Sequence, residues 1–304
     1  MKITHLDKLP TGENSGYVRH RGGGLDDVWL LSAEEGSVDD YRLGIARASE
    51  EFFSPRHRHN FDQIRFNLAG LMNYGARKFI KAGDIGYFPE GTAYGPQAQS
   101  QGEGPAMTMI IQFGGASRGG MLSNRQISVA FEALKKLGRF EKGIFYQSED
   151  AKLPHKTQID AAEAIWEYTT ERPLEFPKPR YEEPVIIYPE NFAWQRDIEH
   201  PGAMIKKLGS FGELSLEISM LKLAGAELPI PPRAGRRLFF VIDGEGTVDG
   251  EPFRRYSAFE VPKRSAASIA SKTTADLLMI GMPIFDMDYR AEGEQSSLAF
   301  AAPA

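Results

Sequence analysis

The 304-residue sequence contains no cysteine and no surplus of basic residues. The lack of cysteine excludes disulfides, thiol nucleophiles and cysteine-ligated zinc or iron–sulfur sites. The formal net charge is −5 at pH 7, and no long run of Lys or Arg occurs. Proteins that bind nucleic acid normally carry a basic surface for the phosphates. We therefore expect no nucleic-acid partner.

Long hydrophobic runs are also missing. No segment approaches the roughly 20 apolar residues that a membrane-spanning helix needs, and the first residues, MKITHLD, lack the apolar core of a signal peptide. We expect a cytoplasmic protein with no membrane partner. Hydrophobic residues still make up 41% of the chain, which is enough for two domains that each have a core.

Histidine is scarce, with six residues, but His57 and His59 are separated by only one position. Strand side chains alternate, so two residues at this spacing point to the same side of a strand. Imidazoles that converge inside a small barrel can share one metal ion. Residues 27–113 consist of short strand-like segments between Gly and Pro residues, a pattern typical of a β-sandwich or barrel.

Two spaced motifs carry a resemblance to a known family. Six residues are in register with it: His57, His59, Gly70, Gly83, Pro89 and Gly91. The pattern resembles the two motifs of the cupin superfamily. Three positions depart from it: Glu51 replaces the first Gly, Gln63 replaces the metal-binding Glu, and Tyr94 replaces the last His.

The resemblance implies a jelly-roll β-barrel that holds one divalent metal ion. The implied ligands are His57 and His59, with Gln63 and Tyr94 as third and fourth partners. Iron is the first expectation, and Mn, Ni and Zn are alternatives, since imidazole suits all of these metals. The opposing interpretation is that the two histidines are remnants of an ancestral site, or polar residues near the barrel mouth.

Gln63 and Tyr94 each have several interpretations. Gln63 could ligate a cation through its amide oxygen, or be a buried amide that bonds to its neighbours. Tyr94 could be a phenolate ligand to iron, a catalytic residue that exchanges a proton with the substrate, or an aromatic that packs at the barrel mouth.

Alternation along the strand adds two candidate substrate-binding residues. If Gln63 points inward, Arg65 and Asn67 do as well, while Ile64 and Phe66 pack on the other side. An inward Arg65 is suited to a substrate carboxylate or enolate. A turn after His59 would reverse this register and place Arg65 in solvent.

The first unit is repeated in the second half of the chain. His57 and Pro231 are 174 positions apart, as are Gly70 and Gly244, and Pro262 follows Pro89 by 173. Such a repeat is strong evidence for architecture. The second unit has Pro231, Arg233, Arg237 and Ala267 at the ligand positions. Arg and Pro side chains have no lone pair for a cation, so we expect no metal there.

The sequence therefore predicts an all-β-dominated bicupin with three segments. These are an N-terminal barrel (1–118), a helical and Pro-rich connector (119–199) and a degenerate C-terminal barrel (200–304). In the connector, residues 127–137 follow helical spacing with Gly138 at the helix end, and Gln158 to Thr170 predicts a second helix.

The function that the resemblance implies is that of a metal-dependent enzyme. The expected activity is that of a mononuclear iron dioxygenase that acts on a small carboxylated or aromatic molecule. The alternatives are a cupin isomerase or lyase, and a non-catalytic small-molecule-binding or structural bicupin. The apolar strand face of Ile64, Phe66 and Leu68 must also be covered, either in a homodimer or by the same chain.

Overall fold

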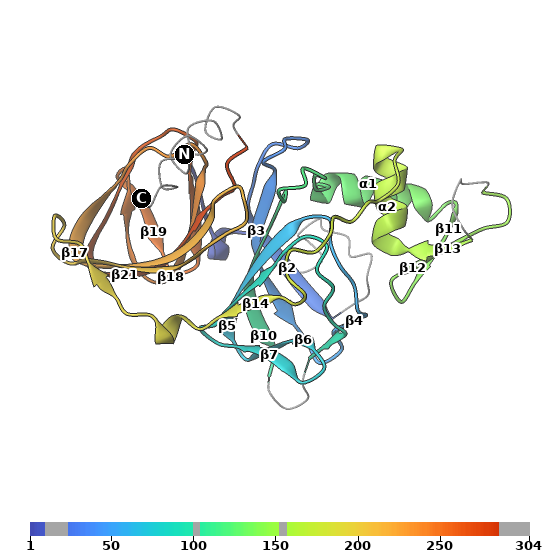
Figure 1. Ribbon diagram of the computed structural model, residues 1–304, viewed down its shortest axis with the longest axis horizontal. Coiled ribbons are helices and arrows are strands. Elements are labelled where there is room, and N and C mark those ends of the chain that lie inside the picture. Colours follow the sequence, from blue (N-terminus) through green and yellow to red (C-terminus); the bar gives the residue numbers. More distant parts are fainter. Residues whose placement is uncertain (10–23, 100–103, 152–156, 286–304) are drawn as a thin grey trace, which may run out of the picture. The chain divides into compact units, whose positions relative to one another are not determined.

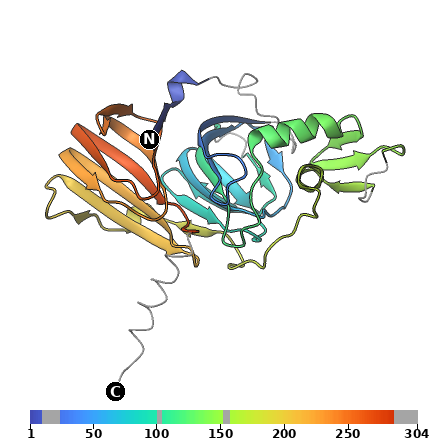
Figure 2. The ribbon, with the colours of Figure 1, turned by 90° about the horizontal axis from the view of Figure 1, so that it is seen from above.

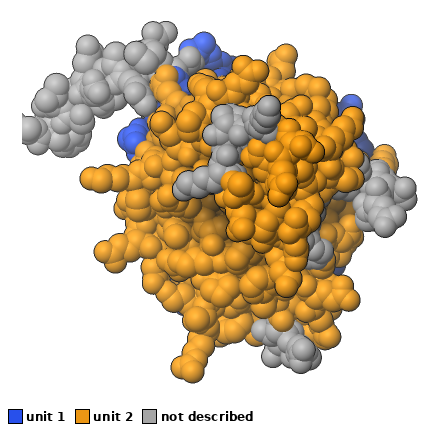
Figure 3. Space-filling model, turned by 90° about the vertical axis from the view of Figure 1, so that its right-hand side faces the viewer, with its two compact units in different colours: residues 1–7, 191–304 blue, residues 8–190 orange. Residues whose placement is uncertain are grey.

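The computed structural model describes residues 1–9, 24–99, 104–151 and 157–285. The chain divides into two compact units, residues 8–190 and residues 1–7 with 191–304 (Figure 3). This division differs from the three predicted segments in two respects. The first strand of the chain belongs to the C-terminal barrel, and residues 119–190 belong to the unit of the N-terminal barrel. The cause in each case is strand pairing between distant parts of the sequence. Residues 2–5 pair with residues 257–260, and residues 185–187 pair with residues 85–87.

The N-terminal barrel is built on a six-stranded antiparallel sheet in the order β14-β8-β5-β10-β3-β2 (Figure 1). Its strands are β2 (Leu25–Ser32), β3 (Tyr41–Ala48), β5 (Asp62–Ala69), β8 (Ile85–Phe88), β10 (Ala106–Phe113) and β14 (Val185–Ile187). Two short pairs complete it: β4 (Phe53–Ser54) with β9 (Gln97–Ala98), and β6 (Leu71–Gly75) with β7 (Lys78–Lys81). The edge strand β14 comes from the far end of the Pro-rich segment.

The C-terminal barrel is built on an eight-stranded sheet in the order β1-β20-β18-β21-β17-β16-β15, with β19 paired to β18. The strands are β1 (Lys2–His5), β15 (Gln195–Arg196), β16 (Ala203–Phe211), β17 (Leu216–Ile230), β18 (Arg237–Val248), β19 (Glu251–Arg254), β20 (Ser257–Val261) and β21 (Ala267–Gly281). Short 3-10 helices lie at η1 (Leu6–Lys8) and η3 (Pro189–Asn191).

The two barrels repeat one topology. The order β8-β5-β10-β3-β2 corresponds strand for strand to β20-β18-β21-β17-β16, and each barrel gains one edge strand from a distant segment, β14 or β1. Turn conformations repeat as well: Gly83 and Gly91 have positive φ, and so do Tyr256 and Arg264, 173 positions later. The predicted all-β, jelly-roll architecture with two barrels is confirmed.

The helices occur between the barrels in sequence, as predicted. Helix α1 (Asn124–Leu134) begins where Ser123 and Gln126 form a capping box, because each side chain bonds to the other's main-chain N–H. Gly138 does not end this helix; it begins strand β11 (Gly138–Glu141), where an added Cβ would lie 2.2 Å from the Tyr146 carbonyl oxygen.

Helix α2 (Ala161–Thr170) begins three residues later than the predicted Gln158. Strand β13 (Gln158–Asp160) precedes it and pairs with β12 (Ile144–Gln147) in a small sheet with β11. The helices and this sheet pack together, as the green part of Figure 2 shows. No α-helix in the described ranges has the length and hydrophobicity to cross a membrane.

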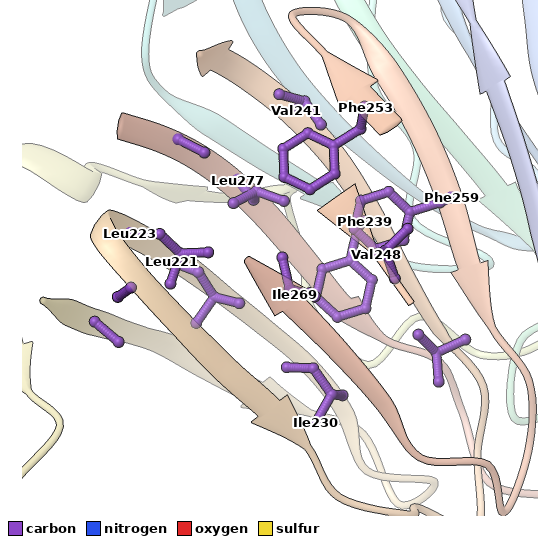
Figure 4. Packing of buried hydrophobic residues seen from close by; sticks show 14 residues of the cluster. Leu221, Leu223, Ile230, Phe239, Val241, Val248, Phe253, Phe259, Ile269 and Leu277 are labelled. Carbon is purple, nitrogen blue, oxygen red and sulfur yellow. The ribbon is translucent and has the colours of Figure 1, made fainter. Parts of the chain in front are cut away.

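The interiors of the two barrels are filled differently. Apolar side chains fill the C-terminal barrel, with Phe253 and Phe239 both stacked on Phe259 (Figure 4). The inward side of β5 in the N-terminal barrel instead carries the buried polar residues Gln63 and Arg65. Buried polar groups require partners, so the N-terminal barrel is where a site is expected.

Candidate functional site in the N-terminal barrel

The two histidines lie on the segment between β4 and β5, not on a continuous strand. His57 forms an isolated antiparallel bridge with Tyr94. The main-chain N–H of each residue donates to the carbonyl of the other, at 3.0 and 2.9 Å. This bridge sets His57 and Tyr94 directly across from each other, although 37 positions separate them.

The Tyr94 hydroxyl oxygen is the point at which the site converges. The Nε2 atoms of His57 and His59 lie 3.1 and 2.9 Å from it. Arg65 donates to the same oxygen from Nη2 at 2.8 Å, and its guanidinium also lies over the rings of Tyr94 and Phe88. Tyr94 itself is 3% exposed. Four side chains that the sequence selected are therefore in contact.

The protonation pattern of His57 follows from its neighbours. Its Nδ1 lies 2.7 Å from the carbonyl oxygen of Pro55, which can only accept a hydrogen bond. In the neutral ring the proton is therefore on Nδ1, and Nε2 accepts from the Tyr94 hydroxyl. The ring of His59 lies edge-on to that of His57 and stacks on Phe61.

The orientation of the Gln63 amide is fixed by a chain of hydrogen bonds that begins at Arg42. Arg42 has only donors, so the atom of Gln112 that it meets at 2.5 Å is the oxygen. The Gln112 amide nitrogen then donates to the Gln63 oxygen at 2.8 Å. Gln63 consequently turns its nitrogen toward the Tyr94 oxygen, at 3.5 Å. It presents a donor at the centre of the site, where a metal would need an acceptor.

A cavity of about 170 Å³ opens beside this centre. Its polar lining includes Arg42, His57, His59, Gln63, Arg65 and Gln112. Its apolar lining includes Trp29, Phe52, Phe61, Ile165, Trp166 and Phe176. A lining that combines cationic donors with aromatic rings suits a small molecule that has an acidic group and an apolar body.

Two of the predicted site residues do not line the cavity among the residues described. Tyr94 lies behind the two imidazoles, so the structure gives it contact with His57, His59 and Arg65 instead of an exposed face. Asn67 is fully buried and donates to the carbonyls of Gly70 and Ile80. It therefore fixes the turn at the end of β5, and substrate contact is not its role in this geometry.

The residues present do not fit the predicted four-ligand metal site. Gln63 turns a donor to the centre, and the buried Arg65 guanidinium adds a positive charge at the oxygen that would be the fourth ligand. The described residues contain no group of three His, Cys, Asp or Glu side chains that could hold a metal ion. A divalent cation beside a guanidinium, without a carboxylate, carries a large electrostatic cost.

Arg42 and Gln112 were missed at the sequence level although they complete the site. Arg42 lies on β3, where it also contacts Asn124 and lies over Trp29. Gln112 lies on β10, opposite both Arg42 and Gln63 in the sheet register. The available signal was a polar side chain within a strand of mostly buried residues. Linking Arg42 and Gln112 to Gln63 requires the pairing of β10 with β3 and β5, which the sequence does not give.

A second buried polar cluster lies on the other side of β5. Asp62 is 5% exposed and accepts from the Glu90 main-chain N–H at 2.8 Å and the Tyr87 hydroxyl at 3.1 Å. Burial, with a further contribution from the charge of Glu90, raises the pKa of Asp62 to about 7. A raised pKa means that folding favours the protonated carboxyl, so this stability is present at low pH and is lost as pH rises from about 4 to about 7.

We expect Asp62→Asn to flatten the dependence of stability on pH, because an amide cannot ionise. At 1.36 kcal/mol per pKa unit, the loss in the wild type between pH 4 and 8 is about 4 kcal/mol. Urea unfolding at several pH values measures it, with Asp26→Asn as control, because the Asp26 side chain is only partly buried. Equal slopes in Asp62→Asn and the wild type would contradict the expectation.

In the C-terminal barrel, the arginines at the positions of the predicted metal ligands connect neighbouring chain segments. Arg233 donates to the carbonyls of Met282 and Ser215 at 2.8 and 2.6 Å, and Arg237 donates to the carbonyl of Ser265 at 3.1 Å. Desolvation lowers the pKa of Arg237. These arginines tie neighbouring chain segments together.

Comparison with known proteins bears on the fold. No family model matches the chain, and no curated protein matches its sequence. Solved structures do match. Bacillus subtilis oxalate decarboxylase, in its S161A mutant, gives a TM-score of 0.55 at 12% identity and covers 93% of this chain and 78% of its own. The chain has the bicupin fold.

Two further solved structures match over nearly all of the chain. A candidate dioxygenase from Nostoc punctiforme has a TM-score of 0.57 at 10% identity, covering 94% of this chain and 84% of its own. Streptomyces albus HEPD, solved with 2-hydroxyethylphosphonate and Fe(II) bound, has a TM-score of 0.55 at 13% identity, covering 99% and 79%. At these identities the likeness shows the fold alone, since one fold carries many functions.

Proposed function

We propose that the N-terminal barrel of this bicupin is an enzyme active site for a small carboxylated molecule with an aromatic or branched apolar part. One observation carries the proposal: Arg65 lines the cavity and shares the Tyr94 oxygen with both imidazoles. A buried guanidinium binds carboxylates strongly because the hydrogen bonds are charge-assisted. The aromatic part of the lining supports the choice of an apolar body.

The chemistry that this arrangement supports is acid–base catalysis of the isomerase or lyase type. His57 and His59 line the cavity, and the Tyr94 hydroxyl lies between their Nε2 atoms. A proton that His59 accepts from the substrate can pass to His57: the phenol oxygen takes the Nε2 proton of His59 while the phenol hydrogen moves to Nε2 of His57. His59 is the proposed catalytic residue that meets the substrate. Tyr94 relays the proton, and His57 holds it until it returns by the same path.

The binding part of the proposal is tested with phenylacetate and its neutral isostere phenylacetamide. We expect phenylacetate to bind and phenylacetamide to bind about 10- to 100-fold more weakly, the size of one charge-assisted hydrogen bond. Arg65→Met should remove the preference for the acid. Isothermal titration calorimetry measures the four affinities, those of both ligands for each protein. Equal affinity for acid and amide in the wild type would refute the role of Arg65.

A second candidate is the iron-dependent dioxygenase that the sequence motifs imply. The observation that favours it is the convergence of two Nε2 atoms on one point, with His57 oriented by the Pro55 carbonyl. Histidines that bind metals are oriented in this way. HEPD, a neighbour in fold, was solved with Fe(II) bound. Metal content decides between the two candidates, as the Discussion sets out.

A further inference from the structure

The segment between α2 and β14 has an unusual relation to the barrel. These residues, 172–184, are here termed the strap, and they contain Pro173, Pro177, Pro179 and Pro184. Among the residues that the structure describes, no main-chain to main-chain hydrogen bond of the kind that joins loops elsewhere connects the strap to another segment. Proline lacks an N–H and favours an extended chain. The strap is therefore held by its side chains and by close packing.

One of these attachments is a buried ion pair. Arg180 donates to the carboxylate of Glu90 at 2.7 Å, where the Glu90 side chain is 0% exposed and that of Arg180 is 26% exposed. Ser117 donates to the same carboxylate from its main-chain N–H and its hydroxyl, at 2.8 and 2.5 Å. Glu90 is thus fixed on the barrel side, and Arg180 is the movable partner.

Three further contacts join the strap to the barrel, two at the residues that follow β8 and one at the start of β7. The Thr92 hydroxyl donates to the Tyr181 carbonyl at 2.9 Å, and Lys78 pairs with Glu183. At Gly91, an added Cβ would lie only 2.2 Å from the Pro177 carbonyl oxygen. The main chains of barrel and strap therefore touch at Gly91.

The strap also forms part of the cavity wall. Leu174 and Phe176 line the cavity. The guanidinium of Arg58 lies over the Phe176 ring, 4.2 Å from its centre. Arg58 also lines the cavity and directly precedes His59. Displacement of the strap would remove two apolar side chains from the wall next to the imidazoles.

We propose that the strap is a removable wall of the cavity, and that ligand enters and leaves when Arg180 separates from Glu90. The proposal adds a regulated entry to the proposed function and rests on it for the identity of the cavity as a ligand site. Segments with few main-chain hydrogen bonds open more readily than a barrel sheet. Of the two ion pairs of the strap, Arg180–Glu90 is the one with a fully buried partner, whereas Lys78–Glu183 is exposed. We therefore expect separation of Arg180 from Glu90 to limit how often the strap opens.

Limited chymotrypsin digestion of the full chain, with the cuts located by mass spectrometry, tests the opening directly. Arg180→Met keeps the aliphatic stem and removes the charge, and we expect cleavage after Tyr181 in the strap to become about tenfold faster or more. The matched control is Arg172→Met, at an exposed position of the same strap. Strap cleavage that is equally fast in Arg180→Met and Arg172→Met would overturn the proposal.

A pair of glycine variants supplies an independent steric test. Gly91→Ala places a Cβ against Pro177, at φ +78, and should displace the strap. Gly83→Ala imposes the same kind of backbone strain at φ +92, with nothing within 4 Å of its Cβ. We expect fast strap cleavage by chymotrypsin in Gly91→Ala alone. Fast cleavage in both variants, or in neither, would count against close contact as the cause.

Ligand kinetics separate the strap proposal from the proposed function. Trp29 and Trp166 line the cavity, so their fluorescence can report phenylacetate binding in stopped flow. Arg180→Met should raise the association and dissociation rates together, by about fivefold or more, and leave the affinity nearly unchanged. Unchanged rates would overturn gated entry. If wild-type protein binds no phenylacetate, the proposed ligand class fails, and the digestion experiments still decide whether the strap opens.

Discussion

Wild-type protein purified without chelators and then soaked with Fe, Mn, Ni and Zn salts is expected to hold far less than one metal ion per chain. The reason is the donor set at the centre of the N-terminal barrel. Gln63 turns its nitrogen inward, and Arg65 occupies the Tyr94 oxygen. Only the two imidazoles are left as strong neutral donors. Elemental analysis after desalting measures the metal content.

The double variant Gln63→Glu with Tyr94→His should bind metal at close to one ion per chain. The carboxylate supplies negative charge next to Arg65, and the new imidazole replaces the oxygen on which the hydrogen bonds converge. Three imidazoles and a carboxylate form a strong site for iron, zinc or manganese. Adding His57→Ala to the double variant should lower the metal content again. Stoichiometric metal in the wild type would contradict this account and favour the iron dioxygenase.

Tyr94→Phe is expected to destabilise the protein by about 2–4 kcal/mol, an estimate for buried donors that lose their acceptor when one of them is charged. The hydroxyl oxygen is bonded to Arg65 and to the Nε2 atoms of both histidines, and Tyr94 is 3% exposed. Phenylalanine keeps the ring packing and removes only this oxygen. The loss of unfolding free energy therefore measures what the hydrogen bonds of this oxygen contribute to stability.

Urea unfolding of Tyr94→Phe measures the change, with Tyr74→Phe as the matched control. Tyr74 packs against the same apolar cluster, and its ring lies edge-on to Phe88. Removing its partly buried hydroxyl should cost less than about 0.5 kcal/mol, as for most substitutions outside a polar network. If the two variants are equally stable, the Tyr94 oxygen is not the centre of the network.

The sequence predicted the architecture because turn and strand residues recur at the same spacing in both halves of the chain. Turn positions at Gly70 and Gly83 recur at Gly244 and Tyr256, and all four residues have positive φ. The strand order of the two barrels follows from this repetition. The edge strands were not predictable in the same way. Strands β1 and β14 join sheets through pairing with β20 and β8, far away in sequence.

Within the site, the sequence determined the group of residues and their approximate placement. Spacing brought His57, His59, Gln63 and Tyr94 together, and alternation placed Arg65 at the cavity beside Gln63. The same alternation predicted Asn67 at the substrate, whereas the structure places it in the buried part of the barrel, outside the cavity lining. The strand ends two residues later, and Asn67 bonds to the carbonyls of the turn.

Only the tertiary structure decided which atom of each side chain faces the centre. The Gln63 amide is oriented by Gln112 and Arg42, from two other strands, and Arg65 is oriented by the Tyr94 oxygen. A motif fixes residue types along one chain segment, but a buried amide or guanidinium adopts the orientation that satisfies all of its neighbours. Those neighbours are brought together by strand pairing, which is why the motif indicated a metal and the folded barrel indicates a hydrogen-bonded centre.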